Sequence, residues 1–321
     1  MVGVASDRLG VNVRWSLEEL PEVAPERPLL VASPRWDGVA LPIEPAARWN
    51  EVPSSRIEEA AALASGGVVA LGGGSAIDLG KAISATAGVP LVSIPTTYSG
   101  AEWTEYYGVR YPQRRMVGGG GGAHPAGIVY EVELTLALPR AETVGTAMNA
   151  LAHCAEALYV QGHNVGADEH ALAGAKLIGA WLPRVVDAPH DREARTELLR
   201  GACEGGQALA GSFLALAHAI AQAIGGAYGL PHGTLNGIVL APVLRWNEQW
   251  VPDAVRHFRE AVGVDVEELN ALGGVTKLSE LRVPEADLPA LAAAAAQRGG
   301  NQANPRPATP AEIEELLGSV F

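Results

Sequence analysis

Short apolar segments alternate with longer amphipathic ones in the first part of the chain. Residues 28–34, 68–73 and 90–97 are short, mostly aliphatic runs that end in Pro, Gly or Thr, which is typical of buried strands. Residues 56–66 and 75–88 lie between them and carry apolar residues at helical spacing. Alternation of strands with helices predicts a parallel sheet with crossover helices.

The pattern changes near residue 140. Five successive glycines within 116–127 predict a flexible loop, because glycine supports regular structure poorly. From Arg140 onward the apolar residues follow helical spacing and no strand is predicted. We therefore expect an α/β domain over 1–138 and an all-helical domain over 139–321. In the tail, Thr309, Pro310 and Glu312 predict a helix start with a capping box.

Composition narrows the classes of partner. The net charge is −13, which argues against nucleic acid as the main partner because phosphate binding needs Lys and Arg stripes. No apolar leader is visible at the start of the chain, and Cys154 and Cys203 show no metal spacing, so we expect buried thiols in a cytoplasmic protein. Residues 205–244 hold no charge, but Pro231 and many glycines favour a buried helix and turn over a membrane span.

A glycine-rich turn follows the second predicted strand. The segment "VVALGGGSAIDLGK" (68–81) is a strand, a turn and a helix, although it fits neither GxGxxG nor a P-loop. Glycines let a phosphate approach the backbone, and the N-terminus of a helix attracts anions. Ser75 can add a hydroxyl there. Thr96 and Thr97 follow the next strand, at the carboxyl end where ligands of open α/β sheets bind.

Three histidines form the second candidate site. Asn149 and His153 are four residues apart and so share a helix face, as do His218 and Gln222, while His232 lies on a Pro-His-Gly turn. Each histidine alone is more typical of a satisfied core residue. Because buried polar groups need partners, the alternative interpretation is a shared site in which these side chains contact each other, a metal or a substrate.

Several motifs together resemble the iron-containing (group III) alcohol dehydrogenase family, and within it the maleylacetate reductase branch. The resemblance runs in order from about Pro28 to the C-terminus. The motifs that carry it are GGGSAIDLGK (72–81), PTTYSGAE (95–102), MNALAHCAEALY (148–159), EARTELLRGACEGG (193–206), IGGAYGLPHG (224–233) and NPRPATPAEIEELL (304–317).

The resemblance implies a Rossmann-like, dehydroquinate synthase-like domain followed by a helical domain. It implies NAD or NADP, with the choice left open, and contacts to the cofactor from Ser33, Gly73, Gly74, Ser75, Asp78, Thr96, Thr97 and Tyr98. The positions of the family's metal ligands are Asn149, His153, His218 and His232. An Asn in place of the usual Asp weakens the case for a metal, although three imidazoles still suit zinc or iron.

Gln222 departs from the family pattern, which has a proton-handling histidine there. An amide can orient a substrate but cannot act as an acid or base. The predicted catalytic residues are therefore Gln222 and His218, with protonation assigned to Tyr98, His124 or water. The usual Gly-x-Gly near the N-terminus is also absent, and Glu131-Val132 replaces an expected Asp-Pro.

Three functions follow from the resemblance. The first is reduction of the C=C bond of an unsaturated oxo-diacid to a 3-oxoadipate-like product by NAD(P)H. The second is a related reduction of another carbonyl or enoyl substrate in a biosynthetic pathway. The third is a redox-impaired lyase or cyclase on the dehydroquinate synthase-like fold. The substrate is expected to be a small anionic or carbonyl compound, and the resemblance implies a homodimer.

Overall fold

The structure, a computed structural model, describes residues 10–321. The prediction that the chain starts without an apolar leader concerns residues 1–9 in part, and those residues lie outside this range. Contacts divide the chain into two compact units. One contains the described residues up to Thr97 together with Ala101–Thr135, and the other contains Tyr98–Gly100 together with Leu136–Phe321. The predicted division after residue 138 lies three residues beyond this boundary and did not anticipate the separate assignment of Tyr98–Gly100.

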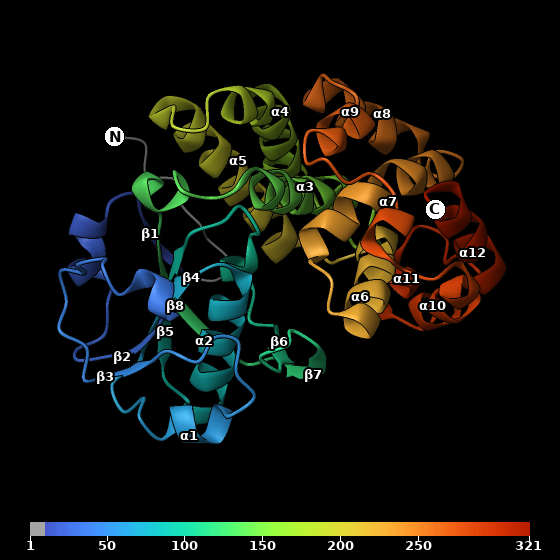
Figure 1. The fold of residues 1–321 in the computed structure, drawn as a ribbon. Helices are drawn as coiled ribbons and strands as arrows, with labels where there is room; N and C mark the ends of the chain where they lie inside the picture. The colour runs from blue at the N-terminus through green and yellow to red at the C-terminus, as the bar shows by residue number, and fades with distance from the viewer. Residues whose placement is uncertain (1–9) are drawn as a thin grey trace. The chain divides into compact units, whose positions relative to one another are not determined.

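The first unit is built on a parallel sheet of six strands (Figure 1). The strand order is β1-β8-β5-β4-β2-β3, and all neighbouring strands in this sheet are parallel. The strands are β1 (Asn12–Arg14), β2 (Leu29–Val31), β3 (Ala47–Trp49), β4 (Val68–Gly72), β5 (Pro90–Pro95) and β8 (His124–Val129). The α/β prediction for this part of the chain is therefore confirmed.

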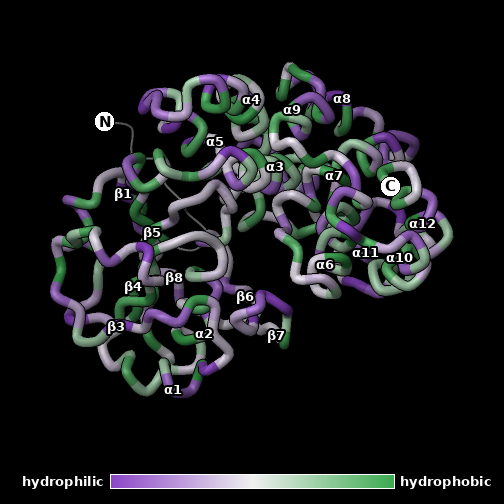
Figure 2. The backbone as a smooth tube through the Cα atoms, viewed as in Figure 1, coloured by the Kyte–Doolittle hydropathy of each residue, from purple (hydrophilic) through white to green (hydrophobic). Residues whose placement is uncertain are grey.

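Alternate residues of each central strand enter different cores. Val68 and Ala70 of β4 pack with Leu79 and Ile83 of α2 (Gly74–Ala87), whereas Val69 belongs to the cluster on the other face. This period of two is the geometry of a strand buried on both faces. It explains why β4 is hydrophobic along its whole length (Figure 2). Helix α1 (Ile57–Ala61) is shorter than the predicted 56–66.

The expected flexible loop at 116–127 is wrong. Residues Met116–Gly120 form β7, which pairs antiparallel with β6 (Tyr107–Arg110), and β8 begins at His124. A Cβ at Gly119 would lie 2.8 Å from the Tyr107 carbonyl oxygen, and one at Gly120 would lie 2.7 Å from the Tyr107 hydroxyl. The glycines are therefore needed for close packing in the hairpin, which composition alone does not reveal.

The second unit is built from helices and has no strand among its described residues after Leu136 (Figure 1). Helix α3 packs against α4, α5 and α7. The helices are α3 (Arg140–Ala157), α4 (Val165–Asp187), α5 (Arg192–Gly211), α6 (Leu216–Tyr228), α7 (His232–Asn247), α8 (Pro252–Val262), α9 (Val266–Ala271), α10 (Leu288–Ala296), α11 (Gly299–Ala303) and α12 (Pro310–Ser319).

Two local predictions in this unit are confirmed. Thr309 and Glu312 form the capping box of α12. Cys154 and Cys203 are buried thiols and form no disulfide among the described residues. Within residues 10–321, no single helix is both long and apolar enough to cross a membrane; only α5 and α6 taken together meet that test, and they are bent by 100° at the break between them.

Candidate functional site

The predicted glycine turn connects β4 to α2. Gly72 has a φ of 148°, a backbone conformation that residues with a side chain rarely adopt. The amide of Thr96 donates to the Gly72 carbonyl oxygen at 3.1 Å. A Cβ at Gly73 would lie 2.9 Å from Cγ2 of Thr97. No side chain of the described residues caps α2, so the amides at Gly74 and Ser75 begin an uncapped helix. This turn can hold a phosphate group.

Asp78 and Lys81 are occupied by the fold itself. The Asp78 carboxylate accepts the amide of Gly108 at 3.2 Å. Lys81 Nζ donates to Thr104 Oγ1 at 2.9 Å and to the Tyr106 carbonyl at 2.8 Å. Burial lowers the pKa of Lys81, and the Asp78 carboxylate offsets part of this effect. The two side chains anchor the chain around β6, so we leave Asp78 out of the proposed cofactor contacts.

The end of β2 carries an ion pair. The Ser33 carbonyl accepts Nη2 of Arg48 at 3.2 Å, and the same nitrogen lies 2.7 Å from Oδ1 of Asp37. A carboxylate in this region favours the ribose of NAD, whereas a free arginine favours the phosphate of NADP. Since the two groups neutralise each other, the choice of cofactor stays open.

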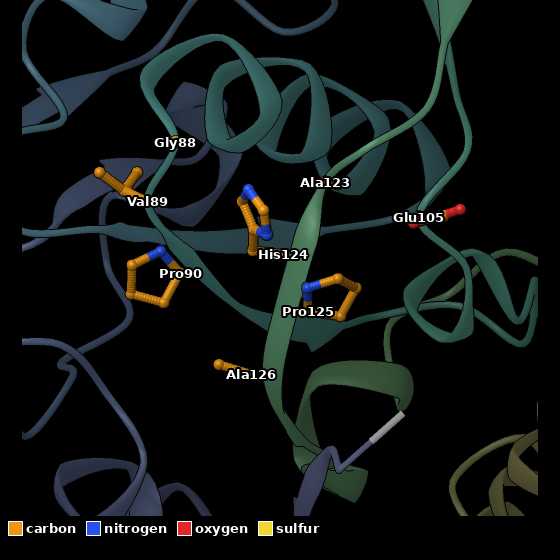
Figure 3. A pocket seen from close by; sticks show the side chains of 8 residues that line it. All are labelled: Gly88, Val89, Pro90, Glu105, Ala123, His124, Pro125 and Ala126. Carbon is orange, nitrogen blue, oxygen red and sulfur yellow. The ribbon is translucent and has the colours of Figure 1, made fainter. Parts of the chain in front are cut away.

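His124 lies at the other end of the sheet from the glycine turn. It is paired in register with Pro90, the first residue of β5, whereas Gly72 is paired with Pro95 at the carboxyl end of that strand. Figure 3 shows the His124 ring between Val89 and Pro90 on one side and Pro125 on the other. The surrounding cavity has a volume of about 430 Å³. The expectation that His124 protonates a substrate beside the glycine turn does not agree with this placement.

Tyr98 belongs to the helical unit and is fully buried. Its hydroxyl accepts Nη1 of Arg195 at 3.1 Å, and its amide donates to Thr146 Oγ1 at 3.2 Å. Arg195 is 1% exposed and also donates to Thr143 Oγ1 at 3.1 Å. These bonds fix the segment Tyr98–Gly100 on α3 and α5. The tyrosine hydroxyl therefore has a structural partner, and we do not assign it the proton-donor role expected above.

Asn149 joins three neighbours in the helical unit. Its Nδ2 donates to the Ser99 carbonyl at 2.8 Å and lies 3.3 Å from Nε2 of His153. Its Oδ1 accepts Nδ2 of Asn236 at 2.6 Å. Because a carbonyl can only accept, Ser99 fixes the amide orientation, and His153 Nε2 must accept in turn. The proton of neutral His153 is therefore on Nδ1, which is buried and has no hydrogen-bond partner among the described residues.

A buried carboxylate positions His218. Glu156 is fully buried, and its Oε2 lies 2.7 Å from Nδ1 of His218 and accepts the amide of Ala215 at 2.7 Å. The His218 ring stacks on that of His153 with centroids 4.7 Å apart. Burial and the adjacent His218 hold the pKa of His153 well below its usual range. His218 Nε2 is also buried without a hydrogen-bond partner among the described residues.

The predicted metal ligands do not form a metal centre. His153 and His218 are stacked, and His232 opens α7 beside Gly225, where a Cβ would lie 3.0 Å from the ring carbon Cε1 of His232. Within residues 10–321, no group of three or more His, Cys, Asp or Glu side chains is arranged to hold a metal ion. The Asn149 amide nitrogen faces His153 and cannot be a ligand. The residues present do not fit a zinc or iron site.

Gln222 lies one turn after His218 on α6 and contacts an arginine. Nη1 of Arg298 donates to Gln222 Oε1 at 3.4 Å, and Nη2 donates to the Gln222 carbonyl at 3.2 Å. A cation thus stands where the resemblance predicts proton-handling chemistry. The helical unit brings together Asn149, His153 and His218, with Gln222 on the next turn of α6.

Comparison with protein families decides the assignment. Residues 143–321 match the C-terminal model of the Fe-containing alcohol dehydrogenase family, and residues 46–120 match the iron-containing alcohol dehydrogenase model. The chain belongs to the iron-containing alcohol dehydrogenase family. Membership makes it an oxidoreductase, and it implies NAD(P) and iron as the family's cofactors.

Individual members of the iron-containing alcohol dehydrogenase family are similar over most of the chain. Maleylacetate reductase 1 of Rhodococcus opacus is 36% identical over 79% of this chain and 72% of that protein. The match to maleylacetate reductase of Burkholderia cepacia is 38% identical and covers 64% of this chain and 58% of that protein. The crystal structure of maleylacetate reductase from Rhizobium sp. strain MTP-10005 has a TM-score of 0.85 at 29% identity, covering 97% of this chain and 96% of that chain.

Three residues at the site escaped the sequence analysis: Glu156, Arg195 and Arg298. Glu156 had a usable signal, because it is the only charged residue between Thr143 and Leu158, and a lone carboxylate in an apolar helix must find a partner. Arg195 and Arg298 gave no such signal in the sequence, because Arg195 bonds to Tyr98 and Arg298 bonds to Gln222, each on a segment distant in the chain.

Proposed function

We propose that the protein is an NAD(P)H-dependent reductase of the maleylacetate type. Its substrate would be an unsaturated oxo-diacid, and the product a 3-oxoadipate-like diacid. The observation that carries this proposal is the match to maleylacetate reductases, with 36% identity to the Rhodococcus opacus protein over 79% of the chain. The nicotinamide supplies a hydride to the C=C bond when it is bound.

The glycine turn supports the nucleotide part of the proposal. Gly73, Gly74 and Ser75 would hold the pyrophosphate, because the start of α2 is uncapped and a side chain at Gly73 would collide with Thr97. Thr96 and Thr97 follow β5 at the same carboxyl end of the sheet.

The stacked histidines support the substrate part. Hydride addition to an enone leaves negative charge on the oxo group, which a hydrogen-bond donor stabilises. In our proposal His153 Nδ1–H donates to that oxygen. His218 moves a proton at Nε2, with the Glu156 carboxylate orienting the ring through Nδ1. The bond to Asn149 keeps His153 in the required tautomer.

Gln222 supports a second candidate within the same chemistry. The family pattern resembled in sequence has a histidine there, and this chain has an amide bonded to Arg298. This difference favours a related carbonyl or enoyl substrate in place of maleylacetate itself. Turnover of maleylacetate faster than that of any other compound in a panel of enones would exclude the second candidate.

Binding and turnover test the main proposal separately. We expect purified protein to bind NADH or NADPH in calorimetry and to consume it when maleylacetate is added. Gly73→Ala should lose nucleotide binding because the new methyl group meets Thr97. Gly318→Ala is the matched control, since a Cβ there meets no atom within 4 Å. A wild-type protein that binds neither nucleotide would contradict the proposal.

A further inference from the structure

Arg298 stands between two helices that pack on α6. It follows α10 and is the N-cap residue of α11, and both helices contact α6 (Figure 1). Its side chain reaches the α6 face that carries Gln222, and a Cβ at Gly226 would lie 3.8 Å from its Nη2. The arginine therefore follows α6 from Gln222 to Gly226.

The backbone that carries Arg298 is rigidly held. A Cβ at Gly300 would lie 2.5 Å from the Ala215 carbonyl oxygen, so only glycine lets this connection approach the start of α6 so closely. Asn301 is buried, donates to the Ala296 and Ala308 carbonyls at 3.0 and 2.9 Å, and accepts the amide of Ala308 at 2.8 Å. These contacts hold the backbone next to Arg298 against the start of α6.

The guanidinium has only neutral partners. Both of its bonds to Gln222 go to uncharged oxygens, and the described residues offer it no ion pair. Its Nε is buried with no hydrogen-bond partner among the described residues. Partial burial lowers the pKa of Arg298, although an arginine stays charged in proteins. A half-buried cation with an unused donor favours an anion, and a carboxylate matches the planar fork of an arginine.

We propose that Arg298, oriented by Gln222, binds a carboxylate group of the substrate. This assignment of a diacid rests on the proposed function. His218 and Gln222 lie one turn apart on α6, so the carboxylate would bind on the turn of the helix that follows His218. Gln222 uses its side-chain oxygen and its backbone oxygen to hold the guanidinium in place.

The proposal also explains the amide at position 222. A histidine there would lie against the guanidinium, and its charged form would be disfavoured by like-charge repulsion. A glutamine accepts from Arg298 in every protonation state of the site. The chain thus uses this position for binding an anion, and proton transfer falls to another group.

Binding of adipate, a saturated six-carbon diacid, tests the proposal on the full-length protein by calorimetry. We expect Arg298→Gln to weaken adipate binding about tenfold or more, the usual effect of losing a charge-assisted hydrogen bond. Arg298→Lys should lose part of the affinity, because it keeps the charge but not the fork. Gln222→Glu should also weaken adipate, because its carboxylate would pair with Arg298 internally. Arg256→Gln, which removes an exposed arginine from α8, should change nothing.

The outcomes separate this proposal from the reductase assignment. Equal adipate affinity in wild type and Arg298→Gln, or no adipate binding by the wild type, would overturn the role of Arg298. NADH titrations of the same samples test the reductase assignment independently. Loss of adipate binding with intact NADH binding supports both, and loss of adipate binding in a protein that never binds NADH or NADPH supports only Arg298. If Arg298→Gln does not fold, Arg298→Lys and Gln222→Glu decide.

Discussion

Asn149→Asp changes one atom at the centre of the histidine network. The wild-type amide nitrogen donates to the Ser99 carbonyl at 2.8 Å and to His153 Nε2 at 3.3 Å. A carboxylate can donate to neither. It would also face the Ser99 carbonyl oxygen at hydrogen-bond distance, while the residue is only 9% exposed.

The expected loss follows from these contacts. Each buried acceptor left without a donor costs about 1–3 kcal/mol. His153 can recover its bond by moving its proton to Nε2, so only the Ser99 carbonyl is left without a donor and the net loss in the free energy of unfolding is about 1–3 kcal/mol. For a unit of about 190 residues this lowers Tm by about 2–12 °C. Burial raises the pKa of the new carboxyl, so the loss grows as the pH rises above roughly 4.

Thermal unfolding of wild type and variant, with and without chelator, measures the effect. Asn50→Asp adds the same charge at an exposed position and should leave Tm within about 1 °C. Added zinc should stabilise Asn149→Asp, which regains a carboxylate ligand beside His153 and His218, and should leave the wild type unchanged. A variant as stable as wild type in chelator, or equal stabilisation of both proteins by zinc, would refute this account of Asn149.

Two further predictions concern stability. Arg195→Met should lower the free energy of unfolding by about 2–4 kcal/mol, because Tyr98, Thr143 and Pro189 lose a buried donor. The control is Arg200→Gln, which changes an exposed arginine on the same helix and should cost little. Equal effects of the two variants in denaturant titrations would show that the buried network contributes nothing. The free energy of unfolding should fall as the pH decreases from 6.5, because the pKa of His153 lies well below 6.5 in the folded protein while the unfolded chain takes up a proton near that value. His153→Gln should make this pH dependence shallower, and an unchanged slope in urea titrations would contradict the neutral state of His153.

The elements were predictable because their signals are local. Strands such as β4 and β5 are short β-branched runs ended by Gly or Pro, and the capping box of α12 depends on residues three positions apart. The β6–β7 hairpin was missed because its glycines are required by close packing against Tyr107 on the partner strand, and composition does not reveal this contact.

The features of the candidate site also fall into those that local spacing predicts and those that depend on tertiary contacts. Spacing placed Asn149 with His153 and His218 with Gln222, since residues four apart share a helix face. It could not show that Glu156 holds His218, that Tyr98 turns its hydroxyl to Arg195, or that His124 lies at the far end of its sheet from the glycine turn. Each of these facts depends on segments that are distant in the chain.

By itself the sequence determined most of the strands and helices, the glycine turn that precedes α2, and which family's motifs appear in order. Only the tertiary structure decided the partners of the polar side chains. A buried amide, imidazole or guanidinium must satisfy its hydrogen bonds with whatever the fold brings within about 3 Å. For Asn149 this neighbour is the carbonyl of Ser99, and for Gln222 it is Arg298.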